Sequence, residues 1–80
     1  MSTYAVQPGA RLLWSLRRRQ TDVRCVLYPN TVPVEVQIVQ ERDVVVRNNF
    51  VEEWMAVKWA AAYEEGLRRR GYKDSPDPAV

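Results

Sequence analysis

The side chains that usually carry acid–base or nucleophilic chemistry are scarce in this chain of 80 residues. It contains no histidine, the usual general base near neutral pH. Cys25 is its only cysteine, and the alternation of neighbouring residues places it on the inward side of a strand, where a thiol is usually inert. Ser2, Ser15 and Ser75 have no base partner at a known motif spacing. We therefore expect no catalytic residue and no enzymatic activity.

Two acidic pairs, Glu52-Glu53 and Glu64-Glu65, are the remaining candidates for chemistry. Adjacent residues on a helix point about 100° apart, so neither pair converges on one site. The three glycines are isolated and form no phosphate-binding loop. A single cysteine without histidine excludes the usual zinc ligand sets and an intrachain disulfide. The sequence therefore predicts no metal and no cofactor.

The charge pattern suggests one binding function. Twelve basic and ten acidic residues leave a net charge of +2, too small to indicate nucleic-acid binding by itself. Arg17, Arg24, Tyr28 and Arg47 nevertheless share the outward face of the expected sheet, where arginines can follow a phosphate backbone and an aromatic ring can stack on a base. Arginines also suit an ordinary solvated sheet face. Nucleic-acid binding is therefore kept as the alternative function.

The length indicates one domain with a small core. Such a core rarely supplies more than about 3–5 kcal/mol without a disulfide, a metal or oligomerisation, and only oligomerisation is left here. No apolar run approaches the roughly 18 residues that span a bilayer, so we expect no membrane partner. The lone thiol and the absence of signal-peptide features at the N-terminus predict a cytoplasmic protein. The richness in Arg, Val, Ala and Trp favours a GC-rich bacterial source.

Apolar and polar residues alternate in four segments, which predicts four strands. In the first, Leu12, Trp14 and Leu16 are expected to point inward and Leu13 and Arg17 outward. Short polar or Pro-Asn connections separate the segments, so sequential antiparallel pairing is the default. The expected strands cover residues 11–17, 23–28, 32–39 and 44–47.

A helix is expected from Asn49 to Arg70, with Asn49 and Glu52 forming a capping box and Gly71 ending it. The fold class is then α+β: a four-stranded antiparallel β-meander followed by one long C-terminal α-helix packed on one face (ββββα). We expect a flexible arm at 1–10, a single domain at 11–72 and a disordered tail at 73–80. A helix of this length measures about 33 Å and would outrun strands of about 17–20 Å unless it crosses the sheet diagonally. Its overhanging end would carry Tyr63, Leu67 and the arginines at 68–70.

The expected helix is apolar on two sides, whereas a helix that covers one core usually shows a single stripe. We interpret the line that contains Trp54 as the sheet-facing one. The other line would then meet a partner, which predicts a non-enzymatic binding or regulatory module acting through a homodimer or a protein partner. The alternative is a helix sunk in a curled sheet that buries both lines. The first line consists of Phe50, Trp54, Val57 and Ala61, and the expected partner interface consists of Val51, Met55, Trp59, Ala62 and Tyr63.

Overall fold

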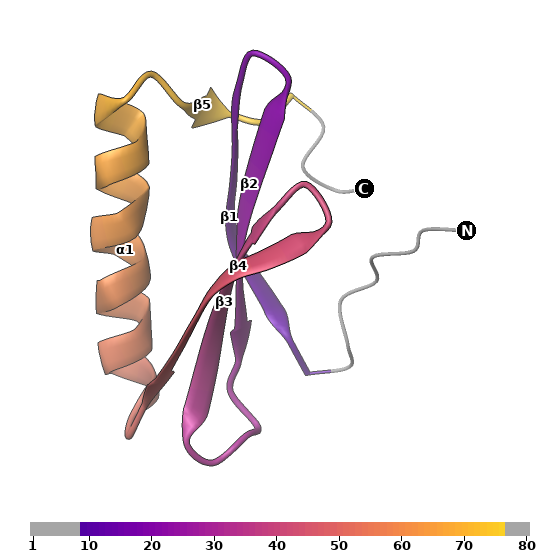
Figure 1. Ribbon diagram of the computed structural model, residues 1–80. Coiled ribbons are helices and arrows are strands. Elements are labelled where there is room, and N and C mark those ends of the chain that lie inside the picture. The colour runs from indigo at the N-terminus through magenta and orange to yellow at the C-terminus, as the bar shows by residue number, and fades with distance from the viewer. Residues whose placement is uncertain (1–8, 77–80) are drawn as a thin grey trace.

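The computed structural model describes residues 9–76, which form one antiparallel sheet covered on one face by a helix (Figure 1). The strands are ordered β4-β3-β2-β1-β5. The expected α+β class and antiparallel meander are therefore confirmed, with a short fifth strand added. Residues 1–8 of the expected arm and 77–80 of the expected tail lie outside the described residues. The elements are β1 (Arg11–Arg18), β2 (Thr21–Tyr28), β3 (Val34–Gln40), β4 (Asp43–Phe50), α1 (Glu53–Arg69) and β5 (Lys73–Asp74).

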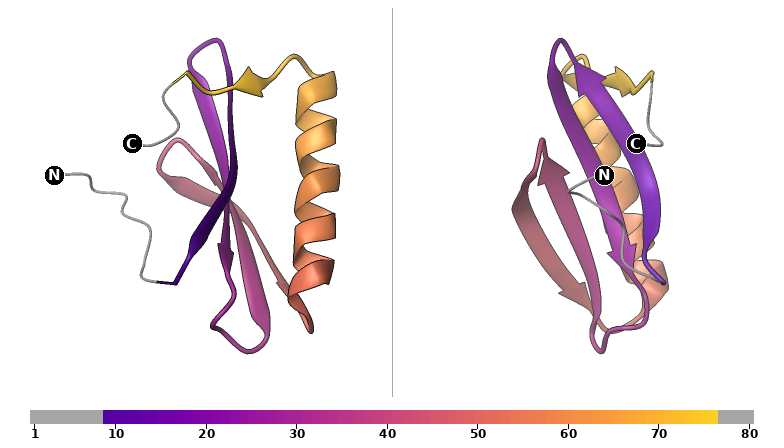
Figure 2. Two further views of the ribbon diagram at one scale, coloured as in Figure 1. Left: turned by 180° about the vertical axis from the view of Figure 1, so that it is seen from behind. Right: turned by 90° about the vertical axis from the view of Figure 1, so that its right-hand side faces the viewer.

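The core lies between α1 and the sheet. Alternate residues of β1, β2 and β3 supply its floor, and Leu16, Cys25 and Ile38 are fully buried there. The buried residues of α1 are Ala56, Ala60 and Leu67, and the two alanines let the helix approach the sheet closely because their side chains are small. Figure 2 shows that the two hairpins are strongly twisted relative to each other, and its right view shows α1 behind them.

A bulge in β1 changes which leucine faces the core. Leu12 is opposite Val26 and Trp14 is opposite Cys25, so Leu13 is an extra residue between the two pairs. Leu13 packs partly buried against the core, while Leu12 shares the outer face with Val26. The expectation that Leu12 points inward and Leu13 outward is therefore wrong, because strict alternation cannot anticipate a bulge.

The fourth strand is longer than the sequence indicated. Asn48 is opposite Val36 and Asn49 is opposite Glu35, so the two asparagines extend β4. The helix begins at Glu53, and the N-cap position is Glu52, which makes no side-chain capping bond. The predicted capping box is thus wrong. Pairing with β3 gives the asparagine backbone a ladder of hydrogen bonds, which outweighs a local cap of about 1 kcal/mol.

The helix ends as predicted, at a glycine. Gly71 has a φ of +98°, and the amides of Gly71 and Tyr72 donate to the carbonyls of Arg68 and Leu67. The chain then forms β5 beside β1, and the Ser75 amide donates to the Ser15 carbonyl over 3.0 Å. The prediction of a disordered tail at residues 73–80 is therefore wrong for the two residues of β5.

The helix and the strands have nearly equal lengths. The 17 residues of α1 span about 25 Å, and the eight residues of β1 span about 26 Å. The expected overhang is wrong, because the helix is shorter and the strands are longer than the sequence patterns suggested. Leu67, placed on the overhang, is a buried member of the core.

Candidate functional site

The single thiol of the chain lies in the core. Cys25 is fully buried, and burial, with a smaller contribution from the charge of Glu64, raises its pKa from 9.0 to about 12. The thiol is therefore protonated and out of reach of solvent near neutral pH. Among residues 9–76, no group of three or more His, Cys, Asp or Glu side chains could hold a metal ion.

The expected partner interface is divided by the fold. Trp59 and Tyr63 are half-buried and form a row of aromatic rings between α1 and the sheet. Phe50 lies 5.9 Å from Trp59 between ring centroids, Trp59 lies 5.3 Å from Tyr63, and Tyr63 stacks on Trp14 at 6.2 Å. Trp59 and Tyr63 therefore pack against the core and do not form an outward face of the helix.

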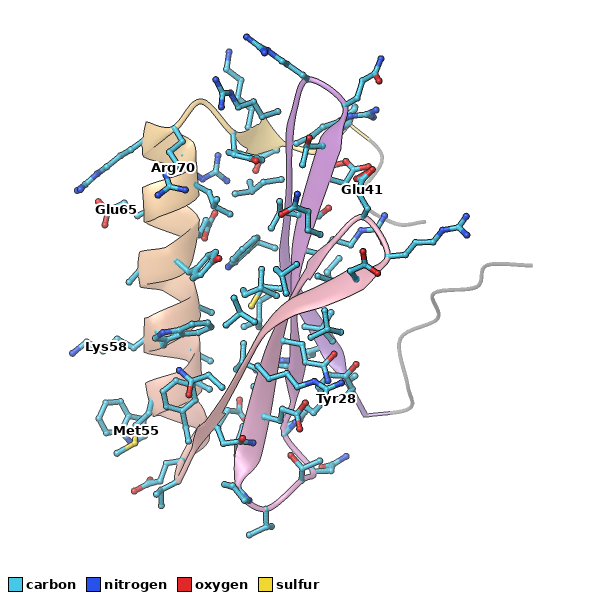
Figure 3. All side chains as sticks on the ribbon, in the orientation of Figure 1. Tyr28, Glu41, Met55, Lys58, Glu65 and Arg70 are labelled. Atoms are coloured by element: carbon cyan, nitrogen blue, oxygen red, sulfur yellow. The ribbon has the colours of Figure 1, made fainter. Side chains whose placement is uncertain are left out.

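The other three members of that set remain at the surface. Val51 is 82% exposed and Ala62 is exposed. Met55 is half-buried and points from α1 away from the sheet, as do Lys58 and Glu65 (Figure 3). The structure thus brings Trp59 and Tyr63 together under the helix and leaves Val51, Met55 and Ala62 apart from them.

Trp54 is the surface residue that the sequence reasoning missed. It was assigned to the core, yet 58% of its surface is exposed, and Val57 beside it is also exposed. The reason is that Phe50 belongs to β4 and reaches the core from the strand, so it does not set the phase of the helix. The phase could have been found from a third line of apolar residues at helical spacing: Ala56, Ala60, Tyr63 and Leu67.

Exposed apolar side chains gather on one stretch of chain. Of the seven large hydrophobic residues that are exposed among residues 9–76, five lie on β4, on the connection to α1 or on the first two turns of α1. Val44 and Val45 lie at the beginning of β4, whereas Val51, Trp54 and Val57 lie around the start of α1, at the other end of that strand. We call the second group the apolar surface; its residues are Val51, Trp54 and Val57.

The arginines expected on one sheet face do share it. Arg24 is opposite Val39 and Arg47 is opposite Gln37, on the side of the sheet away from α1. Tyr28 lies on the same side (Figure 3). We call this side the outer face. Its middle is apolar, because Val26 and Val39 are fully buried there.

Acidic groups accompany these cations on the outer face. Arg17 is opposite Asp22, with 3.7 Å between Arg17 Nε and Asp22 Oδ1. Burial, followed by the charge of Glu35, raises the pKa of Tyr28 above its ordinary value, against a smaller opposing effect of Arg47. Near neutral pH the phenol is therefore protonated, and the face carries mixed charge rather than a purely basic patch.

One cavity of about 250 Å³ borders the second half of α1. The described residues that line it are Tyr63, Gly66, Leu67 and Arg70. Ligand sites normally combine an apolar wall with several convergent polar groups, whereas Arg70 is the only charged side chain in this lining. The cavity therefore has too few polar groups to orient a small polar ligand.

In the described part of the chain, no helix is long and apolar enough to cross a membrane. Comparisons with models of protein families, with curated proteins and with solved structures find no match to this chain.

Proposed function

We propose that the protein is a small, non-enzymatic binding module that acts as a homodimer through its apolar surface. The observation that carries this proposal is the exposure of three hydrophobic side chains, Val51, Trp54 and Val57, around the start of α1. A patch of this kind on a small domain commonly marks an interaction site. Trp54 supports the proposal further, because tryptophan is enriched among the residues that dominate interface energetics.

The size of the core supports self-association as well. The buried side of α1 consists largely of alanines, so the helix contributes modest apolar area to its own fold. Burying a side chain such as Val51 contributes roughly 1.5–3 kcal/mol. Covering several members of the apolar surface would therefore add substantially to a fold that has neither a disulfide nor a cluster of metal ligands in its described residues.

The test is the solution mass, measured by light scattering behind gel filtration over a dilution series. We expect a dimer that dissociates on dilution. Val51→Lys should weaken it about tenfold or more, because tenfold in affinity corresponds to about 1.4 kcal/mol. Val32→Lys is the matched control: Val32 is a second valine outside regular structure, 98% exposed, and distant in sequence from the apolar surface. A monomer at every concentration would refute the proposal.

The outer face supports a second candidate function, single-stranded nucleic-acid binding. Its favourable observation is that Arg24, Arg47 and Tyr28 share one side of the sheet. Fluorescence anisotropy with labelled single-stranded DNA and RNA should then show binding that weakens with salt. Arg47→Gln should reduce it, whereas Arg70→Gln, the same loss of charge on α1, should not. Absence of binding at low salt would eliminate this candidate.

A further inference from the structure

The two edges of the sheet differ in how they are protected from pairing with another strand. At one edge β1 is protected by β5, which pairs with Leu16 and Arg17. At the other edge β4 has a hydrogen-bonded neighbour on one side only among the described residues, although it is as long as β1 and β2. A long open edge presents unpaired amide and carbonyl groups that can pair with another strand.

The sequence of β4 limits where a second strand can pair. Val39 is opposite Val44 and Ile38 is opposite Val46, so Val45 is an extra, bulged residue. Bulges interrupt pairing and are a common protection of sheet edges. The regular part of the open edge is therefore the segment from Val46 to Phe50, and β4 contains no proline.

We propose that the occupant of this edge is β4 of a second copy, paired antiparallel about a two-fold axis at Asn48. This inference rests on the proposed function, because it specifies how the homodimer forms. Two copies related by an axis perpendicular to the sheet must pair residues of the same face. One residue of β4 therefore lies on the axis and faces its own copy.

Only one position of the axis suits the residues present. An axis at Arg47 would place two arginines directly opposite each other, which destabilises a strand pair. An axis at Val46 or earlier would run the pairing into the bulge at Val45. An axis at Asn49 would leave a strand pair of about three residues, because β4 ends at Phe50. An axis at Asn48 uses the whole regular segment.

This register is complementary on both faces of the sheet. On the side of α1, Val46 is opposite Phe50 of the second copy; within one copy both side chains pack partly against the core. On the outer face Arg47 is opposite Asn49 of the second copy. Asn49 is itself opposite Glu35 of its own chain, so arginine and glutamate occupy one row of the joined sheet. The two-fold axis repeats this row of opposite charges.

The register also places the beginning of α1 of each copy just beyond one end of the paired segment. Chain connectivity allows this, because residues 51–52 alone separate β4 from α1. Figure 1 shows the end of β4 and the start of α1 side by side at the lower left. Val51, the most exposed member of the apolar surface, follows directly after the paired segment. Edge pairing would thus cover part of the apolar surface and unite the two sheets.

Three single cysteine variants test the register: Arg47→Cys, Asn48→Cys and Asn49→Cys, each treated with a mild thiol oxidant. Directly opposite residues have Cα atoms about 4.5–5.5 Å apart, within the range of a disulfide. Residues displaced by two positions lie about 8 Å apart and exceed that range. We expect covalent dimer, seen as a doubled mass on a non-reducing gel, from Asn48→Cys alone.

The controls separate this proposal from the homodimer itself. Asn49 is more exposed than Asn48, so random collision would favour the Asn49→Cys variant. The wild type should not cross-link, because Cys25 is fully buried. Covalent dimer from Arg47→Cys or Asn49→Cys instead would overturn the register. A light-scattering dimer without a cross-link at any of the three positions would overturn edge pairing and leave the homodimer standing, whereas a wild-type monomer refutes both.

Discussion

Burial decides what the reactive side chains of this protein can do. The Cys25 side chain is fully buried in the core, in the middle of β2, and therefore behaves as a small hydrophobic residue rather than as a reactive thiol. Trp14 shows the opposite case of a buried residue that keeps a polar contact. Its indole Nε1 donates to the Ala60 carbonyl over 3.0 Å, which ties β1 to the middle of α1.

The burial of Cys25 predicts a loss of stability in alkaline solution. Between pH 9 and about 12 the thiol of the unfolded chain loses its proton while the folded chain retains it, because the folded pKa is raised. The folded state then binds more protons, so the free energy of unfolding falls as pH rises, by up to about 1.4 kcal/mol per pH unit. Below pH 9 this contribution is constant.

Urea unfolding of the wild type and of Cys25→Ala measures this effect. The variant should be less stable below pH 9, because it leaves a cavity, but its stability should fall less steeply above pH 9. Tyrosine ionisation is common to both proteins and cancels in the comparison. Equal slopes in the two proteins would contradict the inferred shift in the pKa of Cys25.

At the scale of single elements, ion pairs hold the C-terminal end of α1. The Arg68 guanidinium donates to Glu64 over 2.9 and 3.0 Å and to Asp74 over 2.6 Å. These bonds join the last turns of α1 to β5. These hydrogen bonds raise the pKa of Arg68 further, so the group stays charged. The same end of the helix contains Gly66, which is exposed and unfavourable for a helix.

The two glycines at this end of the chain should respond in opposite ways to alanine. A Cβ at Gly66 would meet no atom within 4 Å, so Gly66→Ala should raise the free energy of unfolding by about 0.5–1 kcal/mol. Gly71 has a φ of +98°, so Gly71→Ala should lower it by about 1–2 kcal/mol. Urea midpoints of both variants provide the measurement. A destabilised Gly66→Ala would mean that the space beside Gly66 is filled in solution.

For the molecule as a whole, stability and assembly should be linked. A sheet and a single helix enclose one core, while Val44 and Val45 on β4 and the apolar surface at the start of α1 remain exposed. A second copy that binds only the folded state stabilises it by mass action. The stability of the protein should therefore depend on its own concentration.

The thermal midpoint Tm tests this link directly. We expect the Tm of the wild type to rise with total protein concentration, as it does for a dimer that unfolds with dissociation. The Tm of Val51→Lys should depend less on concentration, and that of Val32→Lys should behave like the wild type. A wild-type Tm that is unchanged over a wide dilution series would argue against self-association in the folded state.

Local patterns were sufficient for the class of the fold. The alternation of apolar residues predicted the four main strands, and Gly71 predicted the end of the helix, because both signals depend on a few neighbouring residues. The outward position of Arg24, Tyr28 and Arg47 followed from the same alternation. Burial of Cys25 could be predicted for the same reason.

Tertiary pairing decided the rest. Asn48 and Asn49 locally favour the start of a helix, yet both residues pair with β3 and belong to β4. The reason is that pairing with a neighbouring strand satisfies their backbone groups better than a helix cap does. Because α1 therefore begins only at Glu53, Phe50 belongs to β4 and not to the helix. Ala56 and Ala60 then define the buried side of α1, and Trp54 is exposed. The sequence by itself thus determined the four main strands and the helix, but not the short strand β5. The bulges, the open edge of β4 and the exposed face of α1 depend on which segments meet in space, and local periodicity contains no information about that.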